Sequence, residues 1–269
     1  ENIRFYPEEE KNDKLFGELL AQHADIYIND AFAAAHRGHA SNFAITEFVE
    51  TVAAGLLLKN EIEYSQKTIQ SAISPFGAII GGAKVSSKLD ILNNIILKVD
   101  FLIIGGGMAF TFLKSKGYSI GNSLLEDELV DIAKEIIKKA KENNVEILLP
   151  LDIVGAEEFD NDSPKKIYPV DKIPDNIIGL DIGPATIALF SEKINKAKTI
   201  IWNGPMGAFE MSNFAEGTNK IAHALAESDC LSIVGGGDSV TAINKAGVTN
   251  KISYISTGGG AFLELLEGK

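Results

Sequence analysis

The segment LSIVGGGDS at residues 231–239 decides the fold, because an apolar run stops at three glycines and a helix-like stretch follows. The same arrangement occurs at Gly81-Gly82, at residues 105–107 and at residues 258–260. Apolar strands that each lead through a turn into a helix are typical of a parallel α/β sheet. Free backbone amides at such helix starts bind anions, above all phosphates, and glycine lets the anion approach closely. The sequence therefore predicts phosphate binding at the carboxyl ends of several strands.

Strand-like and helix-like stretches alternate regularly after Ser74-Pro75. Nearly continuous apolar runs predict doubly buried strands, and the intervening stretches have helical length, so we expect one parallel sheet covered on both faces. The predicted strands are residues 78–81, 100–104, 145–149, 177–182, 198–202, 230–234 and 252–256. The predicted helices are residues 84–98, 108–116, 126–143, 184–195, 212–227, 239–246 and 261–267.

The first part of the chain is less regular. We expect strands at residues 2–6 and 25–29, with a helix at residues 13–22 between them. Residues 44–72 contain few helix breakers, and they predict one long helix of the kind that bridges two lobes.

The composition restricts the class of protein. The 269 residues carry a net charge of −12, so a basic nucleic-acid surface is not expected. No apolar stretch of membrane-spanning length and no secretory leader stand out. Cys230, the one cysteine, excludes an internal disulfide, and we expect a reduced, cytoplasmic protein.

Lys84 and Lys88 stand four residues apart after Gly81-Gly82, in what the pattern predicts to be the first turns of a helix. Two ammonium groups on one helix face repel each other and oppose the helix dipole, at a cost of roughly 0.5–1.5 kcal/mol. A bound polyphosphate would remove this conflict. The alternative is that both side chains extend into water.

Two acidic residues are further candidates. Asp238 follows the glycines of residues 235–237, where it would serve as a helix N-cap or hold a magnesium ion beside phosphates. Glu210 follows the turn-rich loop at residues 202–207, and it would either accept hydrogen bonds from ribose hydroxyls or lie free on the surface. Arg4 and Arg37 are the two arginines of the chain, and both are candidates for binding carboxylate or phosphate.

Several familiar signatures are missing from the sequence. There is no GxxxxGK[ST] and no GxGxxG, which disfavours a P-loop protein and an NAD-dependent dehydrogenase. Zinc-ligand spacings and a GxSxG nucleophile motif are absent as well.

Eight motifs, in this order, resemble the phosphoglycerate kinase family over nearly the whole chain: NIRFYPEEEKND, NDAFAAAHRGHAS, GGAKVSSK, IIGGGMAFTF, GLDIGPAT, WNGPMGAFE, VGGGDSVTA and STGGGAFLELLEGK. The resemblance implies a Rossmann-like nucleotide lobe at residues 75–269. It also implies an interdomain helix at residues 56–74 that acts as a hinge. Residues 1–55 would be the remnant of a second α/β lobe that binds the other substrate.

The resemblance further implies reversible phosphoryl transfer from 1,3-bisphosphoglycerate to ADP, giving 3-phosphoglycerate and ATP in glycolysis, with Mg²⁺. Arg4 and Arg37 would bind 3-phosphoglycerate, and Asp238 would hold the metal. The catalytic residues would be Lys84, Lys88 and Gly237, and the chain would act as a monomer. The nucleotide would contact Lys88, Gly179, Asn203, Glu210, Gly236, Gly237, Asp238 and Ser239.

In one respect the chain departs from this family. Family members carry roughly a hundred residues before the first motif, a length typical of a domain, and a closing segment after Lys269. We therefore interpret the chain as a fragment. The alternative to a kinase is a nucleotide-binding module without turnover.

Overall fold

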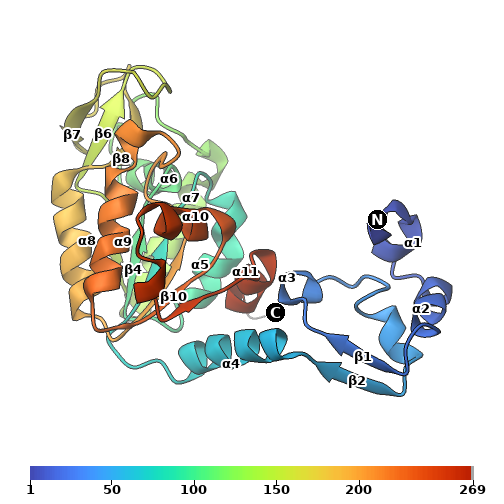
Figure 1. The fold of residues 1–269 in the computed structure, drawn as a ribbon. Coiled ribbons are helices and arrows are strands. Elements are labelled where there is room, and N and C mark those ends of the chain that lie inside the picture. The colour runs from blue at the N-terminus through green and yellow to red at the C-terminus, as the bar shows by residue number, and fades with distance from the viewer. Residues whose placement is uncertain (268–269) are drawn as a thin grey trace.

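The structure is a computed structural model that describes residues 1–267, with the backbone alone for residues 65–70. Helix α4 (Leu56–Gln70) runs between two bodies of unequal size (Figure 1). We call the elements before α4 the small lobe and the elements after it the large lobe. The last two residues of the closing motif, 268 and 269, lie outside the described residues.

A six-stranded sheet forms the centre of the large lobe, and all its strands are parallel. The spatial order is β11-β10-β9-β3-β4-β5. Read from β5, this is the doubly wound dinucleotide-fold order, with its switch point between β3 and β9. The predicted α/β class is confirmed. The strands are β3 (Phe76–Ile80), β4 (Phe101–Ile104), β5 (Glu146–Leu148), β9 (Thr199–Asn203), β10 (Leu231–Val234) and β11 (Tyr254–Ile255).

Helices cover both faces of this sheet because successive strand residues point to opposite sides. Ile80 packs with α5 (Leu89–Ile95), α6 (Met108–Ser115), α7 (Val130–Glu142) and α11 (Gly260–Glu267). Ile79, its neighbour, packs on the other side with α8 (Pro184–Lys196), α9 (Glu216–Glu227) and α10 (Gly237–Lys245). The central strands β3, β4 and β9 are buried throughout, as their apolar runs predict.

A second sheet stands apart from the first in the order β7-β6-β8 and is antiparallel. Its strands are β6 (Asp152–Ala156), β7 (Lys166–Pro169) and β8 (Ile178–Ile182). The prediction that residues 177–182 belong to the parallel sheet is therefore wrong. An apolar run fixes burial, but it does not fix which strand pairs with it.

The small lobe holds α1 (Pro7–Glu10), α2 (Lys14–Ala21), α3 (Phe32–Ala35) and the parallel pair β1 (Ile26–Asn29) and β2 (Thr51–Ala54). The strand predicted at residues 2–6 is wrong. Asn2 instead accepts a hydrogen bond from the Arg4 amide at 2.9 Å, and a 3₁₀ helix spans Ile3–Phe5. The single helix predicted over residues 44–72 is also wrong. That stretch divides into a 3₁₀ turn (Ala44–Glu47), β2 and α4.

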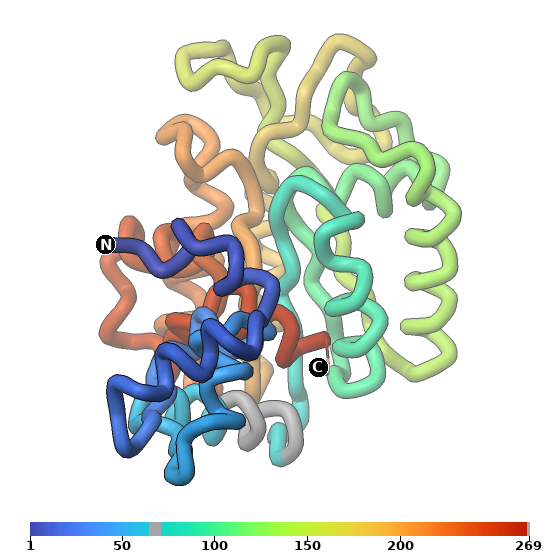
Figure 2. The backbone as a smooth tube through the Cα atoms, turned by 90° about the vertical axis from the view of Figure 1, so that its right-hand side faces the viewer, coloured from blue at the N-terminus to red at the C-terminus, as the bar shows by residue number. Residues whose placement is uncertain are grey.

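Contacts near the C-terminus join α4 to the large lobe. Glu61 is fully buried, and its Oε1 accepts hydrogen bonds of 2.7 Å from both the amide and the hydroxyl of Thr257. The rings of Tyr64 and Tyr254 stack with centroids 4.4 Å apart. In the small lobe, Phe32 packs so closely on Gly258 that a β-carbon there would meet its ring at 2.2 Å. Figure 1 shows α3 of the small lobe beside α11, and in the view of Figure 2 the small lobe lies in front of this C-terminal segment.

No helix within residues 1–267 combines the length and the apolar character needed to cross a bilayer.

Candidate functional site

A polar cavity of about 230 Å³ lies between two of the glycine clusters, at residues 235–237 and 258–260. It opens at the carboxyl ends of the parallel strands, beside the switch point where such folds bind ligands. The structure brings together six of the predicted site residues here. The lining consists of Lys88, Asn203, Gly204, Gly236, Gly237, Asp238, Ser239, Gly259, Gly260 and Leu263.

Asn203 and Lys88 line this cavity and are held in place by hydrogen bonds. Asn203 ends β9 and is buried, and its Nδ2 donates a 2.7 Å hydrogen bond to the Gly235 carbonyl. The Lys88 ammonium donates to Asn203 Oδ1. Burial lowers the pKa of Lys88, and the charges of Asp238 and Glu267 oppose that change. A partly dehydrated cation at a concave surface attracts anions strongly.

The loop at residues 235–239 has a conformation that requires glycine. Gly236 has φ +95°, and a β-carbon at this position would meet Asn203 Nδ2 at 2.5 Å. Ser239 Oγ accepts a 2.6 Å hydrogen bond from the Gly204 amide and so ties α10 to the end of β9. Gly236 itself is the N-cap of α10, so the N-cap role considered for Asp238 is wrong. The Asp238 side chain is exposed in the first turn of the helix, where a carboxylate is favoured by the helix dipole.

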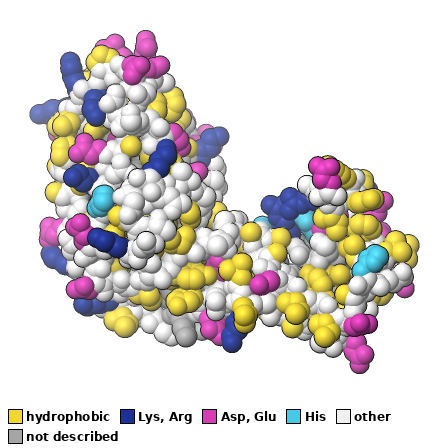
Figure 3. All heavy atoms as spheres, in the orientation of Figure 1, with side chains coloured by type: hydrophobic (Ala, Val, Ile, Leu, Met, Phe, Trp, Pro, Cys, Tyr) yellow, Lys and Arg dark blue, Asp and Glu magenta, His cyan; other side chains and the backbone are white. Residues whose placement is uncertain are grey.

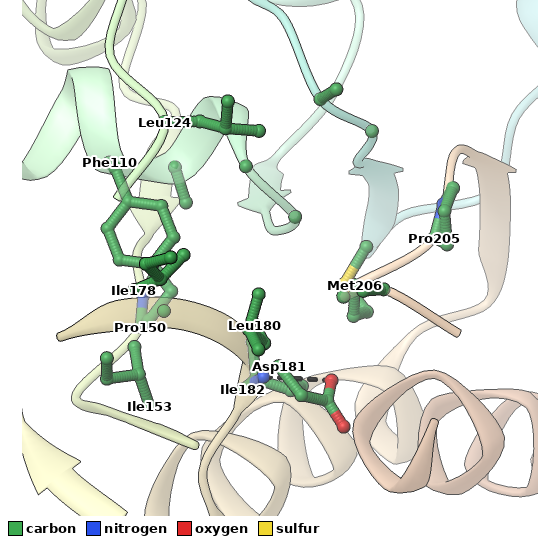
Figure 4. Close-up of a pocket in the computed structure, with 18 of the residues that line it drawn as sticks. Phe110, Leu124, Pro150, Ile153, Ile178, Leu180, Asp181, Ile182, Pro205 and Met206 are labelled. Carbon is green, nitrogen blue, oxygen red and sulfur yellow. Dashed lines mark hydrogen bonds between the residues drawn. The ribbon is translucent and has the colours of Figure 1, made fainter. Parts of the chain in front are cut away.

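An apolar cavity of about 260 Å³ adjoins the polar one, and Asp238 lines both. Figure 4 shows Phe110, Leu124, Ile153, Leu180 and Met206 around this space, from elements on either side of it. Pockets lined by apolar side chains with a few polar groups at the edge are typical of small-molecule sites.

Two predicted residues line the apolar cavity. Gly179 donates its amide to Ser123 Oγ at 2.9 Å, and a β-carbon on Gly179 would meet the Phe110 ring at 2.0 Å. Glu210 lines the cavity with an exposed side chain. Both residues therefore lie at the apolar cavity and not at the polar one.

Lys84 does not share a helix face with Lys88, and this prediction is wrong. Lys84 lies in an irregular segment, a 3₁₀ helix spans Ser86–Lys88, and α5 begins only at Leu89. Glu126 holds the segment by accepting the Ser86 amide at 3.1 Å. Lys84 is exposed and contributes to the lining of neither cavity.

Arg4 and Arg37 are exposed in the small lobe. Glu9 joins the segments that carry these two arginines. It lies in α1, shortly after Arg4, and its Oε2 accepts a 2.9 Å hydrogen bond from the amide of Ser41, which follows Arg37. Figure 3 shows basic side chains of the small lobe on the side that faces the large lobe. Arg37 follows His36, and a β-carbon on Gly260 would lie 3.2 Å from His36 Nε2. Because Gly260 lines the polar cavity, this segment adjoins it.

The apolar wall is the part of the site that the sequence did not predict. Phe110, Leu180 and Met206 fall within quoted motifs, but nothing in their spacing separates a cavity wall from ordinary core. Asp181 was missed as well. The available signal was an acidic residue between Leu180 and Ile182, inside a buried strand.

For a divalent metal, the described residues supply little on their own. No cluster of three His, Cys, Asp or Glu side chains within residues 1–267 is placed to hold an ion. Asp238 is a single accessible carboxylate at the junction of both cavities. This donor set fits Mg²⁺, which usually binds through one or two carboxylates, waters and substrate phosphates.

The fold and these cavities define a doubly wound α/β protein with a candidate small-molecule site at the carboxyl edge of its parallel sheet. A phosphoglycerate kinase family model matches residues 1–269, and the chain belongs to this family. It is therefore a phosphotransferase, a kinase of glycolysis. The phosphoglycerate kinase of Geobacter metallireducens is 56% identical over 269 residues, all of this chain and 68% of that protein. The phosphoglycerate kinase of Dictyoglomus turgidum is 55% identical over 270 residues, again 68% of its length.

Solved structures are similar in the same way. The structure of phosphoglycerate kinase from Coxiella burnetii matches with a TM-score of 0.94 at 43% identity, covering all of this chain and 69% of that one. The phosphoglycerate kinase from Pyrococcus horikoshii matches with a TM-score of 0.86 at 31% identity, also over 69% of its chain.

Proposed function

We propose that the two adjoining cavities together bind ADP or ATP. The apolar cavity takes the base and ribose, and the polar cavity takes the phosphates. The support is their junction at Asp238 and their position beside the switch point of the sheet. In this assignment Gly179 lies against the base, and Glu210 accepts hydrogen bonds from the ribose.

The phosphate contacts follow from the donors at the polar cavity. Lys88 supplies the fixed positive charge, and Gly236, Gly237 and Ser239 supply the start of α10, whose backbone amides favour an anion. Asn203 orients Lys88 through its Oδ1. When bound with the nucleotide, Mg²⁺ would be held by Asp238 and the phosphates, and it would neutralise charge on the phosphoryl group.

The second substrate, 3-phosphoglycerate or 1,3-bisphosphoglycerate, is assigned to Arg4 and Arg37. A guanidinium binds carboxylate or phosphate through two parallel hydrogen bonds. We propose that residues 1–55 carry this site, that residues 56–74 form the interdomain helix, and that residues 75–269 form the nucleotide-binding lobe. Closure about this helix brings the substrates together and excludes water.

The proposed reaction needs no nucleophile from the protein. The carboxylate of 3-phosphoglycerate attacks the γ-phosphorus of ATP, or in reverse an ADP oxygen attacks the acyl phosphate. The protein positions both substrates and stabilises charge on the transferred group. Lys84, Lys88 and Gly237 are the proposed catalytic residues. Lys84, exposed beside the cavities, would reach the transferred phosphoryl group on closure.

As for partners and setting, we propose a cytoplasmic monomer that binds neither nucleic acid nor membrane. The net charge of −12 supports the first of these exclusions, because phosphate backbones require a basic surface.

The adjoining pair of cavities is the observation that carries this proposal. A coupled assay of the purified chain with 3-phosphoglycerate and Mg·ATP tests it. We expect ADP formation that requires both substrates. The second candidate is a nucleotide-binding module without turnover. It predicts nucleotide binding with no turnover in the same assay.

A further inference from the structure

Asp181 is a buried carboxyl group that the proposed reaction does not use. It stands in β8 between Leu180 and Ile182, which both line the apolar cavity, and it is 4% exposed. Figure 4 shows Leu180 in the wall of the cavity and Asp181 beside it. Its Oδ1 accepts the Ile182 amide at 2.9 Å, and its Oδ2 accepts the Gly217 amide at 2.7 Å.

The bond to Gly217 caps a helix from outside its own segment. Helix α9 has Ala215 as its N-cap residue, which offers no side-chain acceptor, so the Asp181 carboxyl group supplies one from β8. A β-carbon on Gly217 would meet Asp181 Oδ1 at 2.3 Å, so the helix start lies directly against the carboxyl group.

The loop between β9 and α9 forms one wall of the cavity, and it is bonded to the two elements that Asp181 joins. In this loop the Ala208 amide donates to the Leu180 carbonyl at 2.7 Å, and the Met206 amide donates to Thr218 Oγ1 in α9 at 3.0 Å. Glu210 stands in the loop as well. This wall is therefore hydrogen-bonded to both β8 and the start of α9, and Asp181 links these two elements.

We propose that Asp181 is a positioning residue for the nucleoside, so that nucleoside affinity depends on the protonation state of this one carboxyl group. The inference rests on the proposed nucleotide site. An ionised carboxylate accepts both amides fully, whereas protonation turns one oxygen into a hydroxyl and weakens one of the two bonds. The loop is then held less firmly, and affinity falls.

Few other charges act on this group. Glu216, the first residue of α9, and Lys165, before β7, are the charged neighbours that influence it. Glu210 and Asp238, both exposed, are the other carboxylates of the cavity lining, and none of the four histidines contributes to it. Burial raises the pKa of Asp181 to about 7, which brings its titration into an accessible range.

Adenosine is a suitable probe because it carries no phosphate and does not itself titrate near neutral pH. Binding is measured by calorimetry at about pH 6 and about pH 8. We expect the wild-type affinity to rise about threefold to fivefold between these values, as one hydrogen bond is strengthened. Asp181→Asn mimics the neutral acid, and we expect it to bind with the low affinity at both pH values.

Asp152 provides a matched control. It is also a buried strand carboxylate that caps a helix from outside, since it accepts the amides of Ala185 and Thr186 at 3.0 and 2.8 Å at the start of α8. It does not line the apolar cavity. Asp152→Asn should keep the wild-type pH dependence, whatever it costs in stability.

Three results would overturn the inference. The wild type could bind adenosine equally well at both pH values. Asp181→Asn could bind it as tightly as the wild type does at the higher pH, or Asp152→Asn could lose as much affinity as Asp181→Asn. The wild-type comparison remains decisive if Asp181→Asn fails to fold. A wild-type protein that binds neither adenosine nor ADP at any pH contradicts the proposed nucleotide site itself. Adenosine binding without pH dependence contradicts only the role of Asp181.

Discussion

Lys88 is the side chain on which the proposed phosphate binding depends most. Its ammonium group loses hydration at the polar cavity, as its lowered pKa indicates. Lys88→Ala removes the charge that attracts phosphate and also removes this cost. We expect ADP affinity to fall about tenfold or more, as for loss of a charged hydrogen bond, with the melting temperature unchanged or slightly higher. Calorimetry and thermal unfolding measure the two effects.

Lys84→Ala is the matched control, since Lys84 is exposed and outside both cavities. It should leave ADP affinity near that of the wild type and lower kcat, if this lysine acts only on the transferred group. A clearly lower melting temperature for Lys88→Ala would contradict the view that its charge is costly without a bound anion.

Asp181 also predicts a pH dependence of stability. A carboxyl group whose pKa is raised on folding stabilises the protein below its unfolded value near 3.8, and this stabilisation is lost as pH rises toward about 7. The loss has an upper bound of about 4 kcal/mol. Denaturant unfolding across this range should show the wild type losing stability relative to Asp181→Asn as pH rises, because the amide does not titrate. A constant difference would contradict the raised pKa.

At the residue scale, the sequence predicted which side chains line the polar cavity better than it predicted how they are arranged. Asn203, Gly236 and Ser239 do meet Lys88 at one cavity. The prediction that Lys84 and Lys88 share a helix face was wrong, because it assumed helical spacing where the chain is irregular. Local spacing carries no information about such a departure from the helix.

At the scale of elements, the glycine loops set the shape of the polar cavity. Gly236→Ala strains a residue at φ +95° and also drives a β-carbon into Asn203. We expect ADP affinity to fall about tenfold or more, because Asn203 and Lys88 must move. Gly247→Ala is the control, since Gly247 has φ +70° with open space around it. It should cost about 1 kcal/mol of stability with no loss of affinity. Equal affinities in both variants would contradict the role of this loop.

Elements with strong apolar runs were predicted well, and those that depend on distant partners were not. β3, β4 and β9 are fully buried strands that the pattern identifies within a few residues. β2 was missed because its sequence, TVAA, gains its strand form from pairing with β1. Propensity is a weak guide where such tertiary pairing decides the conformation.

At the scale of the whole molecule, the two substrates are assigned to different lobes. Arg37→Ala should therefore lower the affinity for 3-phosphoglycerate about tenfold or more, by loss of a bidentate contact, and leave ADP affinity unchanged. Lys14→Ala is a control in the same lobe, since Lys14 pairs with Glu47 at 2.7 Å on the surface. Equal losses for both substrates in Arg37→Ala would contradict the two-sided arrangement.

The central claim is that the carboxyl edge of the six-stranded sheet binds a nucleoside diphosphate. Calorimetric titration of the folded chain with Mg·ADP tests it most directly. The account predicts saturable binding at a single site, strongly weakened in Lys88→Ala. A folded wild-type sample that releases or absorbs no heat of binding at millimolar ADP would contradict it.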